Sequence, residues 1–363
     1  MTLQAADNPI SFFDIAAEFG YPTDNKLGNY RNTTSQAGWD LGNLPLDTGI
    51  PTSGPIKFSD FYSKQLNVVI NCWDVSDTGT NYHVNARTEW ENNNLAIVGD
   101  TNGTKKESGS KVIIHVNKEI GSVANNDYSD NKEAKRGKCA LRTGPDAGQT
   151  AWNADVSMQI DLGDSARLRG AGGKGGKGNN PANDAGSIRH GREGNSALGI
   201  QFGTSTNKTI INVGDGAVLR AGFGGGGGGG GCYNHEGKGK GGHPYPGGGG
   251  GGGAGYPEGA GGARGGGAFG DGAEANPGSA GTKTAGGAGG DPGNGAARKG
   301  GDGGDADANS QSGANGSGSA GSSSGGSGGG NGTALRSTGA SNTYTLNNSG
   351  TMTGGTKNSG DVS

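Results

Sequence analysis

The stretch from Arg220 to Pro257 reads RAGFGGGGGGGGCYNHEGKGKGGHPYPGGGGGGGAGYP and contains two uninterrupted glycine runs. The runs are residues 224–231 and 247–253, and they flank a short segment rich in Cys, His, Tyr, Lys and Pro. Glycine loses more backbone freedom on folding than any other residue. A folded chain therefore contains such runs only where each position requires the absence of a Cβ atom, and this requirement decides the fold of the region.

Composition divides the chain into two parts. Glycine makes up 84 of the 363 residues, and hydrophobic residues are only 29%, which is too few for one ordinary core of this size. All four tryptophans lie before residue 153, whereas the long glycine tract runs from about residue 170 to about residue 330. The sequence thus predicts an ordinary globular front half and a back half built on glycine.

Charge and hydropathy exclude several classes of protein. The formal net charge is −3 with both signs interspersed, which argues against nucleic-acid binding as the main task. No run of 18 apolar residues is present, so no membrane insertion is expected. The N-terminus has no basic or apolar stretch typical of a signal peptide. Three widely spaced cysteines, Cys72, Cys139 and Cys232, give no disulfide framework and favour assembly in a reducing cytoplasm.

The first 65 residues contain an internal repeat. Residues 8–15 and 54–61 share the frame P-I-x-F-x-D. In this frame the aspartate is placed to cap a helical turn, and Ser11 with Asp14 fits a capping box. We therefore predict that residues 1–65 form a small module with two capped turns that attaches the chain to a partner.

Residues 66–165 show the pattern of a β-rich domain. Short β-branched stretches, including residues 66–75, 81–88, 111–117 and 156–162, alternate with Asn, Asp and Gly. This pattern predicts short strands, either in a β-sandwich or in the first turns of a β-solenoid.

A second repeat spans the boundary between the two halves. Residues 160–170 align with residues 211–221 at an offset of 51, and residues 344–354 form a degenerate third copy. Each copy reads as strand, tight turn and strand. The dipeptide Leu-Arg recurs, and alternation would point each leucine inward and each arginine outward to brace the structure; its positions are 141–142, 168–169, 219–220 and 335–336.

Three interpretations compete for the glycine tract, which we assign to a domain of residues 166–340 followed by a strand-turn-strand cap at 341–363. A flexible linker would need neither aromatic residues nor recurring strand motifs. Collagen is excluded, because glycine does not occupy every third position throughout and only 12 prolines are present. We favour a bundle of polyglycine-II helices, in which enclosed helices need glycine at every position and outer helices need it at one position in three.

Motifs that carry chemistry are weak in this sequence. Residues 170–175 match the letters of a nucleotide-binding loop, and residues 300–305 match part of a calcium-binding repeat, but neither has the required context. Cys232, His235 and His243, with Glu236 nearby, could ligate a metal, although their spacing fits no standard zinc module. We predict no cofactor, no metal and no catalytic residues, and we interpret the acids of the back half as solvated turn residues.

The strand-turn-strand units, followed by glycine runs broken by short aromatic loops, resemble the adhesins at the tips of long tail fibres of T-even-like phages. The P-I-x-F-x-D pair is similar to segments of marine phage virion structural proteins. The resemblance covers residues 160–363 and implies a polyglycine-II domain whose distal loops bind an outer-membrane protein or surface polysaccharide. It also implies location at a virion tail or fibre tip, assembly in the host cytoplasm, and docking of residues 1–65 to other virion proteins.

On this resemblance we expect a non-enzymatic receptor-binding protein with three candidate loops. A polysaccharide-degrading tailspike, which would need two acids facing a groove, remains an alternative, as does a structural or ice-binding protein, which would need a flat, regular face of short side chains. The candidate receptor-binding residues are Tyr233, Asn234, His235, Lys238, Lys240, His243 and Tyr245 in the first loop, Tyr256 and Glu258 in the second, and Phe269 and Asp271 in the third.

Overall fold

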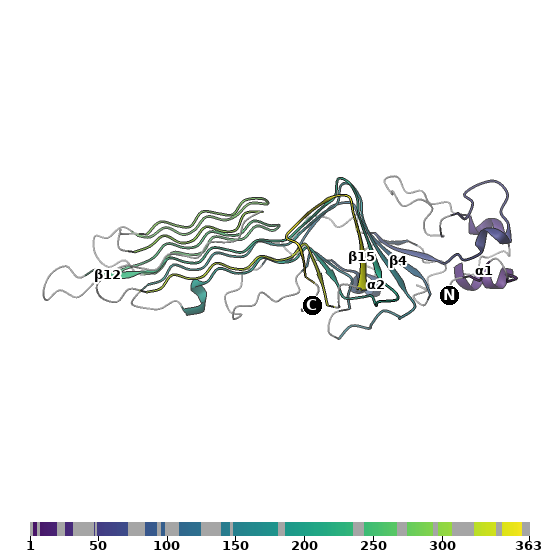
Figure 1. Cartoon of the computed structure of the whole chain (residues 1–363), viewed down its shortest axis with the longest axis horizontal. Coiled ribbons are helices and arrows are strands. Elements are labelled where there is room, and N and C mark those ends of the chain that lie inside the picture. The colour runs from purple at the N-terminus through teal and green to yellow at the C-terminus, as the bar shows by residue number, and fades with distance from the viewer. Residues whose placement is uncertain are drawn as a thin grey trace.

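The structure of the chain, a computed structural model, is an elongated molecule with the N-terminal helices at one end and an array of extended segments at the other (Figure 1). It describes residues 3–5, 8–19, 26–31, 47, 49–71, 84–92, 96–98, 109–124, 139–145, 148–180, 186–234, 243–266, 274–292, 297–306, 323–338 and 343–357. In these ranges no helix has the length and apolar character needed to cross a bilayer.

The chain is mostly β, with few helices among the described residues. The helices are α1 (Phe12–Phe19), α2 (Ala86–Asn92) and the short 3₁₀ helices η1 (Leu27–Tyr30), η2 (Phe58–Phe61) and η4 (Gly186–Arg189). The strands are β1 (Asn67–Asn71), β2 (Val84–Asn85), β3 (Ala96–Val98), β4 (Lys111–Val116), β5 (Glu119–Gly121), β6 (Leu141–Arg142), β7 (Ser157–Leu162), β8 (Arg167–Arg169), β9 (Leu198–Ile200), β10 (Thr209–Val213), β11 (Val218–Arg220), β12 (Cys232–Asn234), β13 (His243–Tyr245), β14 (Leu335–Ser337), β15 (Tyr344–Asn348), β16 (Thr351–Thr353) and β17 (Thr356–Lys357).

Three sheets form a solenoid in the middle of the molecule. Their strand orders are β15-β10-β7-β4-β1-β3, β16-β11-β8-β5 and β17-β14-β9-β6-β2, and every pair is parallel except β1 with β3. From β4 onward each coil gives one strand to each sheet, as in β7, β8 and β9. Of the two expectations for the front half, the solenoid is therefore confirmed and the sandwich is wrong.

Apolar ladders run through the solenoid, one for each sheet. Ile160 pairs with Ile211 in the first sheet, and Leu168 pairs with Leu219 in the second. All four side chains are buried, so the repeat with its offset of 51 marks two successive coils in register.

The third copy of the repeat is only half aligned. Met352 pairs with Leu219 as the sequence alignment predicts, but Ile211 pairs with Leu346 and not with Tyr344. The first strand is shifted by two residues because the turn before β16 is two residues shorter than the turn before β11.

The N-terminal residues pack onto the end of the solenoid. Ile15 and Phe61, one from each copy of P-I-x-F-x-D, are fully buried in the same apolar cluster as the solenoid core. Asp14 accepts a hydrogen bond from the N–H of Ser11 (2.7 Å) and donates its own N–H to the Ser11 hydroxyl oxygen (3.2 Å), which confirms the capping box. Asp60 accepts in the same way from the N–H of Lys57 (2.7 Å). We call this part the N-terminal cap (described residues 3–66), while the predicted division at residues 65, 165 and 340 stays a prediction.

Two local predictions are wrong, one of them only in part. Residues 86–88 belong to helix α2 and not to a strand, because the Asn85 side chain accepts hydrogen bonds from the N–H groups of Arg87 (3.0 Å) and Thr88 (3.3 Å) and so begins a helix. The leucines of the Leu-Arg dipeptides are all buried as expected, but Arg142 and Arg336 are buried too. Arg336 donates to the hydroxyl of Ser196 (3.2 Å), which satisfies part of the guanidinium inside the structure.

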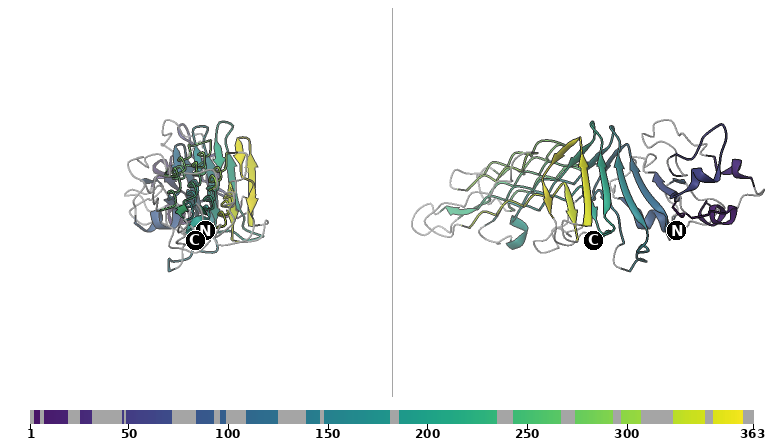
Figure 2. Two further views of the ribbon diagram at one scale, coloured as in Figure 1. Left: turned by 90° about the vertical axis from the view of Figure 1, so that its left-hand side faces the viewer. Right: turned by 45° about the vertical axis from the view of Figure 1, so that its right-hand side comes forward.

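The glycine-rich segments are insertions into two coils of the solenoid. The chain leaves the solenoid after β8 at residue 170 and returns at β9, and it leaves again after β11 at residue 221 and returns at β14. The described parts of these insertions are extended segments that run side by side away from the sheets (Figures 1 and 2). We call them the bundle; its nine segments are residues 170–180, 188–196, 222–231, 247–255, 257–265, 275–282, 285–292, 297–306 and 323–334.

One segment, residues 247–255, lies at the centre of the bundle and is called the central segment. It forms backbone hydrogen bonds with six surrounding segments, and those six also bond to one another in a closed ring. The bonds to the six neighbours are Gly250 to Gly176, Gly226 to Gly251, Gly262 to Gly250, Gly249 to Asn276, Gly290 to Gly249 and Gly251 to Gly301, with donors first.

Hydrogen bonds between neighbouring segments recur every third residue. The N–H groups of Gly170, Gly173, Gly176 and Asn179 donate in turn to the carbonyls of Arg220, Phe223, Gly226 and Gly229. A Cβ on any glycine of residues 247–253 would overlap the backbone of a neighbouring segment. One of the two uninterrupted glycine runs thus lies in the segment that has neighbours on every side.

At the edge of the bundle, polar side chains accept hydrogen bonds from backbone N–H groups that have no neighbouring segment to bond to. Asp302 accepts a hydrogen bond from the N–H of Gly289 (2.8 Å), and Asp305 accepts from the N–H of Gly286 (2.7 Å). Asn331 does the same for Gly224 (3.1 Å). The interpretation of these acids as merely solvated is therefore wrong for Asp302 and Asp305, because their carboxylates replace backbone carbonyls at the edge of the bundle.

Candidate functional site

A β-hairpin projects from the end of the bundle that is farthest from the N-terminal cap (Figure 1). It consists of β12 and β13, which pair antiparallel with Cys232 opposite Tyr245 and Asn234 opposite His243. The hairpin joins segment 222–231 to the central segment, so both of its strands continue directly into the most enclosed parts of the bundle. This end of the bundle is called the tip.

The structure places four of the seven first-loop residues on this hairpin. Tyr233 and Asn234 lie in β12, and His243 and Tyr245 lie in β13, with Tyr245 half-buried. His235, Lys238 and Lys240 lie outside the described residues, and so do Phe269 and Asp271 of the third loop. Gly266 and Glu274, the described residues nearest to the third loop, lie at the tip as well, because Gly265 donates to the carbonyl of Gly247 (3.1 Å).

Tyr256 and Glu258 of the second loop lie at the opposite end of the bundle. Tyr256 donates its N–H to the carbonyl of Gly170 (2.9 Å), the residue that follows β8 of the solenoid. Lys283 lies over the Tyr256 ring at 4.2 Å and bonds to Glu119 of β5 (2.6 Å). These contacts join the bundle to the solenoid, and the structure does not bring Tyr256 together with the hairpin.

Cys232 begins the hairpin as a buried residue. Burial raises the pKa of its thiol, while Arg298 acts in the opposite direction. A raised pKa keeps the thiol protonated, and a protonated thiol is a poor metal ligand. Within the described part of the chain no group of three His, Cys, Asp or Glu side chains could hold a metal, and His235 and Glu236 lie outside that part.

A pocket of about 290 Å³ lies beside the hairpin at the tip. Pro246, which directly follows β13, forms part of its wall, and Lys177, Arg264 and Glu274 bring charge to it. Arg264 and Glu274 form an ion pair with each other. These three residues carry no motif in the sequence, because they come together only where separate segments of the bundle reach the tip. The signal that could have found them is the reversal of chain direction on either side of residues 266–274, which brings Arg264 and Glu274 to the same end as Pro246.

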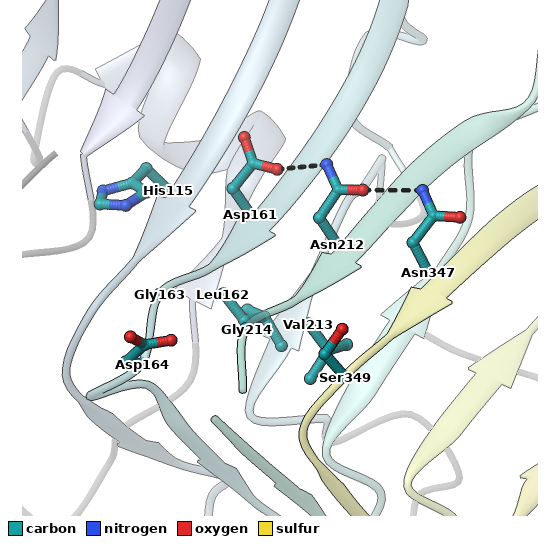
Figure 3. Close-up of a pocket in the computed structure, with 10 residues that line it drawn as sticks. All are labelled: His115, Asp161, Leu162, Gly163, Asp164, Asn212, Val213, Gly214, Asn347 and Ser349. Carbon is teal, nitrogen blue, oxygen red and sulfur yellow. Dashed lines mark hydrogen bonds between the residues drawn. The ribbon is translucent and has the colours of Figure 1, made fainter. Parts of the chain in front are cut away.

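A second pocket, of about 300 Å³, lies on the solenoid where the first sheet turns into the second (Figure 3). It is crossed by a row of polar side chains on four adjacent strands. Asn347 donates to Asn212 (2.8 Å), and Asn212 donates to Asp161 (2.6 Å). His115 is the neighbour of Asp161 on β4, and Asp164 also lines the pocket.

Asp161 holds the row together. It is only 4% exposed, and its second carboxylate oxygen accepts a hydrogen bond from Gln159 (2.6 Å). Burial raises the pKa of Asp161, whereas the hydrogen bonds from Asn212 and Gln159 lower it. The row mixes imidazole, carboxylate and amide groups with exposed Ile210 on the same sheet, so it is not the regular face of short side chains that ice binding needs.

No protein-family model matches the chain, and no curated protein matches it. A solved structure is similar over nearly its whole length. It is the crystal structure of the gp37-gp38 adhesin tip complex of the bacteriophage S16 long tail fibre, with 19% sequence identity and a TM-score of 0.38. The similarity covers 97% of this chain and 98% of that chain.

Proposed function

We propose that the chain is a non-enzymatic adhesin at the tail or fibre tip of a phage virion and binds a bacterial surface receptor through the hairpin and the neighbouring tip loops. The observation that carries this proposal is the hairpin itself, a loop rich in Tyr, His and Lys displayed at one end of an elongated molecule. Tyr233, Asn234, His235, Lys238, Lys240, His243 and Tyr245 form the main contact, and Phe269 and Asp271 add to it.

The bundle is proposed to be a polyglycine-II lattice. That helix has three residues per turn and no internal hydrogen bonds, so its backbone groups bond to neighbours at every third residue. The three-residue recurrence of hydrogen bonds and the six neighbours of the central segment support this assignment. Eight residues of such a helix span about 25 Å, which sets the distance between the tip and the solenoid.

A rigid bundle suits receptor binding because ordering a flexible loop costs free energy on association. The two hairpin strands continue into the central segment and segment 222–231, which bond to six and five neighbouring segments, so the backbone that carries the hairpin is ordered before a receptor binds. Tyr256 and Glu258 stand about one bundle length away from the hairpin, and we assign them to the junction with the solenoid instead of to the main receptor contact.

The adhesin proposal is tested by competition. Purified protein added to host cells should occupy the receptor and slow adsorption of the phage that encodes it, and antibody to the chain should label one end of the tail or fibre. Unchanged adsorption at saturating protein, together with an absence of label on virions, would contradict the proposal.

One observation favours a second candidate function, polysaccharide degradation, because Asp161 and Asp164 line the same pocket. Hydrolysis would release reducing ends from purified host polysaccharide. We expect no release, since the two carboxylate oxygens of Asp161 already accept hydrogen bonds from the amide groups of Asn212 and Gln159. Release that is lost in Asp161→Asn would favour the second candidate.

The N-terminal cap is proposed to dock to another virion protein. Phe13 of α1 is 72% exposed, and Phe58 of η2 is 41% exposed, so the end of the molecule opposite the tip carries apolar surface. Deleting residues 1–65 would also open the solenoid core, so a single surface change is the cleaner test.

Phe13→Ser should leave the melting temperature unchanged and reduce the amount of this chain on purified virions. Burying a phenylalanine contributes about 1.5–3 kcal/mol, so the docking affinity should fall about ten- to a hundredfold. Ile210→Ser, at the 38% exposed residue on the solenoid, is the matched control and should not change the amount on virions. Equal incorporation of the two variants would remove Phe13 from the docking surface.

A further inference from the structure

Charge is unevenly distributed along the bundle. The backbone hydrogen bonds between the central segment and its neighbours show how far each charged residue lies along the bundle from the tip to the solenoid. In the tip half, the described charged residues are Lys177, Arg189, Arg264, Arg298 and Lys299 against Glu274 and Asp291. In the solenoid half they are Lys174, Arg192 and Lys283 against Glu193, Glu258, Asp302 and Asp305. The tip half is therefore basic although the whole chain has a net charge of −3.

The tip pocket concentrates this charge in a concave site. Lys177 and Arg264 line it together with one carboxylate, Glu274. Arg264 is paired with Glu274, whereas among the described residues Lys177 has no ion-pair partner. An unpaired ammonium group in a pocket is a ready binding group for an anion.

The walls of the pocket are fixed by the bundle. Gly265, on the wall, leaves no room for a Cβ, because that atom would lie 2.8 Å from Cβ of Pro246 and 2.8 Å from the carbonyl oxygen of Asn179. The residues before and after Lys177 bond to two different neighbouring segments. Gly176 donates its N–H to the carbonyl of Gly226, and Gly178 donates its N–H to the carbonyl of Ala263. The cation is thus held on a backbone that is ordered before any ligand arrives.

The geometry points to the tip pocket as a binding site for an anionic sugar, meaning a sugar that carries a phosphate or carboxylate group. A volume of about 290 Å³ lies at the lower end of the range for small-molecule pockets and suits one charged sugar ring. A flat acidic protein surface would not enter such a cavity. The inference rests on the proposed function and deepens it, since the pocket adjoins the hairpin and both would face the same host surface.

The test measures binding of glucose 6-phosphate, glucuronate, glucose and inorganic phosphate to the full chain by calorimetry at low and high salt. We expect the two charged sugars to bind more tightly than glucose and inorganic phosphate, with affinities that fall as salt screens the charge. Lys177→Ala should weaken binding of glucose 6-phosphate about tenfold or more. Glu274→Gln should strengthen it severalfold, because the variant removes a competing carboxylate.

Lys174→Ala is the matched control, since Lys174 is the same residue type on the same segment three residues nearer the solenoid. This variant should bind glucose 6-phosphate within about twofold of the parent protein. Equal losses in Lys174→Ala and Lys177→Ala, or equal binding of glucose and glucose 6-phosphate, would overturn the assignment.

Virions separate this inference from the proposed function. If the chain binds host cells through the hairpin while Lys177→Ala changes neither adsorption nor sugar binding, the anionic-sugar site is wrong and the adhesin function stands. If Lys177→Ala loses both sugar binding and adsorption on cells with phosphorylated lipopolysaccharide, the inference holds.

Discussion

Replacing Gly251 by alanine is expected to lower the melting temperature of the protein by about 10 °C or more, or to prevent folding of the bundle. Gly251 lies mid-way along the central segment, and a Cβ there would stand 2.5 Å from the carbonyl carbon of Gly287 and 2.9 Å from the nitrogen of Gly303. Both are backbone atoms of neighbouring segments, so no side chain can turn aside. At least one segment must move outward, which breaks several backbone hydrogen bonds that each contribute about 0.5–1.5 kcal/mol.

The loss in stability should therefore be about 4 kcal/mol or more, and a melting curve followed by circular dichroism or calorimetry measures it. Each kcal/mol shifts the melting temperature by about 2–4 °C for domains of roughly 150–250 residues. The expected effect is large because Gly251 has neighbours on every side, so a movement that relieves the overlap with one segment breaks hydrogen bonds with others.

Gly330→Ala provides the matched control within the same bundle. A Cβ at Gly330 would meet only the Glu193 side chain, at 3.5 Å, which is ordinary van der Waals contact. The variant should melt at the parent temperature or slightly above it, because alanine restricts the unfolded chain more than glycine does. Equal melting temperatures for Gly251→Ala and Gly330→Ala would show that the bundle is not closely packed around the central segment.

The glycine pattern carried most of the information about packing. Residues 224–231 and 247–253 were predicted to be the enclosed positions, and these residues lie in the two segments that bond to the most neighbours. The reason is local and steric. An enclosed backbone has no room for a Cβ at any position, so every residue of the run must be glycine. The strand-turn-strand repeat was equally informative, because stacking in register demands the same side chain at the same depth in each coil.

The topology of the insertions was hidden from the sequence. Leu198 and Leu335 are neighbours in one sheet although 136 residues of the sequence lie between them. The distance between two strands in the sequence does not predict whether they pair, because the bundle inserted between them could be longer or shorter without changing the position of either strand. The buried Arg142 and Arg336 were missed for a related reason, since alternation predicts the face of a strand but not whether another part of the chain covers that face.

The ends of the bundle were also indistinguishable in the sequence. Tyr245 and Tyr256 both precede proline next to the same glycine run, yet one lies at the tip and the other at the solenoid. The difference arises because the central segment runs from the tip to the solenoid, so the turn before it lies at the tip and the turn after it lies at the solenoid. The electrostatic character of the tip was hidden in the same way, because the tip gathers Lys177, Arg264 and Glu274 from three separate segments.

Replacing both Tyr233 and Tyr245 by alanine is expected to reduce adsorption of the phage to its host about thirtyfold or more. Truncating an aromatic anchor in a binding site typically costs about 2 kcal/mol or more, and 2 kcal/mol corresponds to about thirtyfold in affinity. Both residues lie on the hairpin, beyond the segments whose backbones bond in the ring, so the melting temperature should stay close to that of the parent protein.

The measurement is the adsorption rate of otherwise identical virions on the natural host, together with the melting temperature of each purified protein. Tyr256→Ala is the matched control, since it removes the same side chain from the solenoid end of the bundle. It should leave adsorption unchanged, although the loss of its contact with Lys283 should lower stability slightly. Replacing residues 235–242 by an unrelated loop of the same length should change the range of hosts while particles still assemble, because the hairpin strands and the bundle remain. Normal adsorption with both tyrosines removed would move the receptor contact to the Phe269 loop, and normal adsorption with both tip loops replaced would exclude the tip as the receptor-binding end of the molecule.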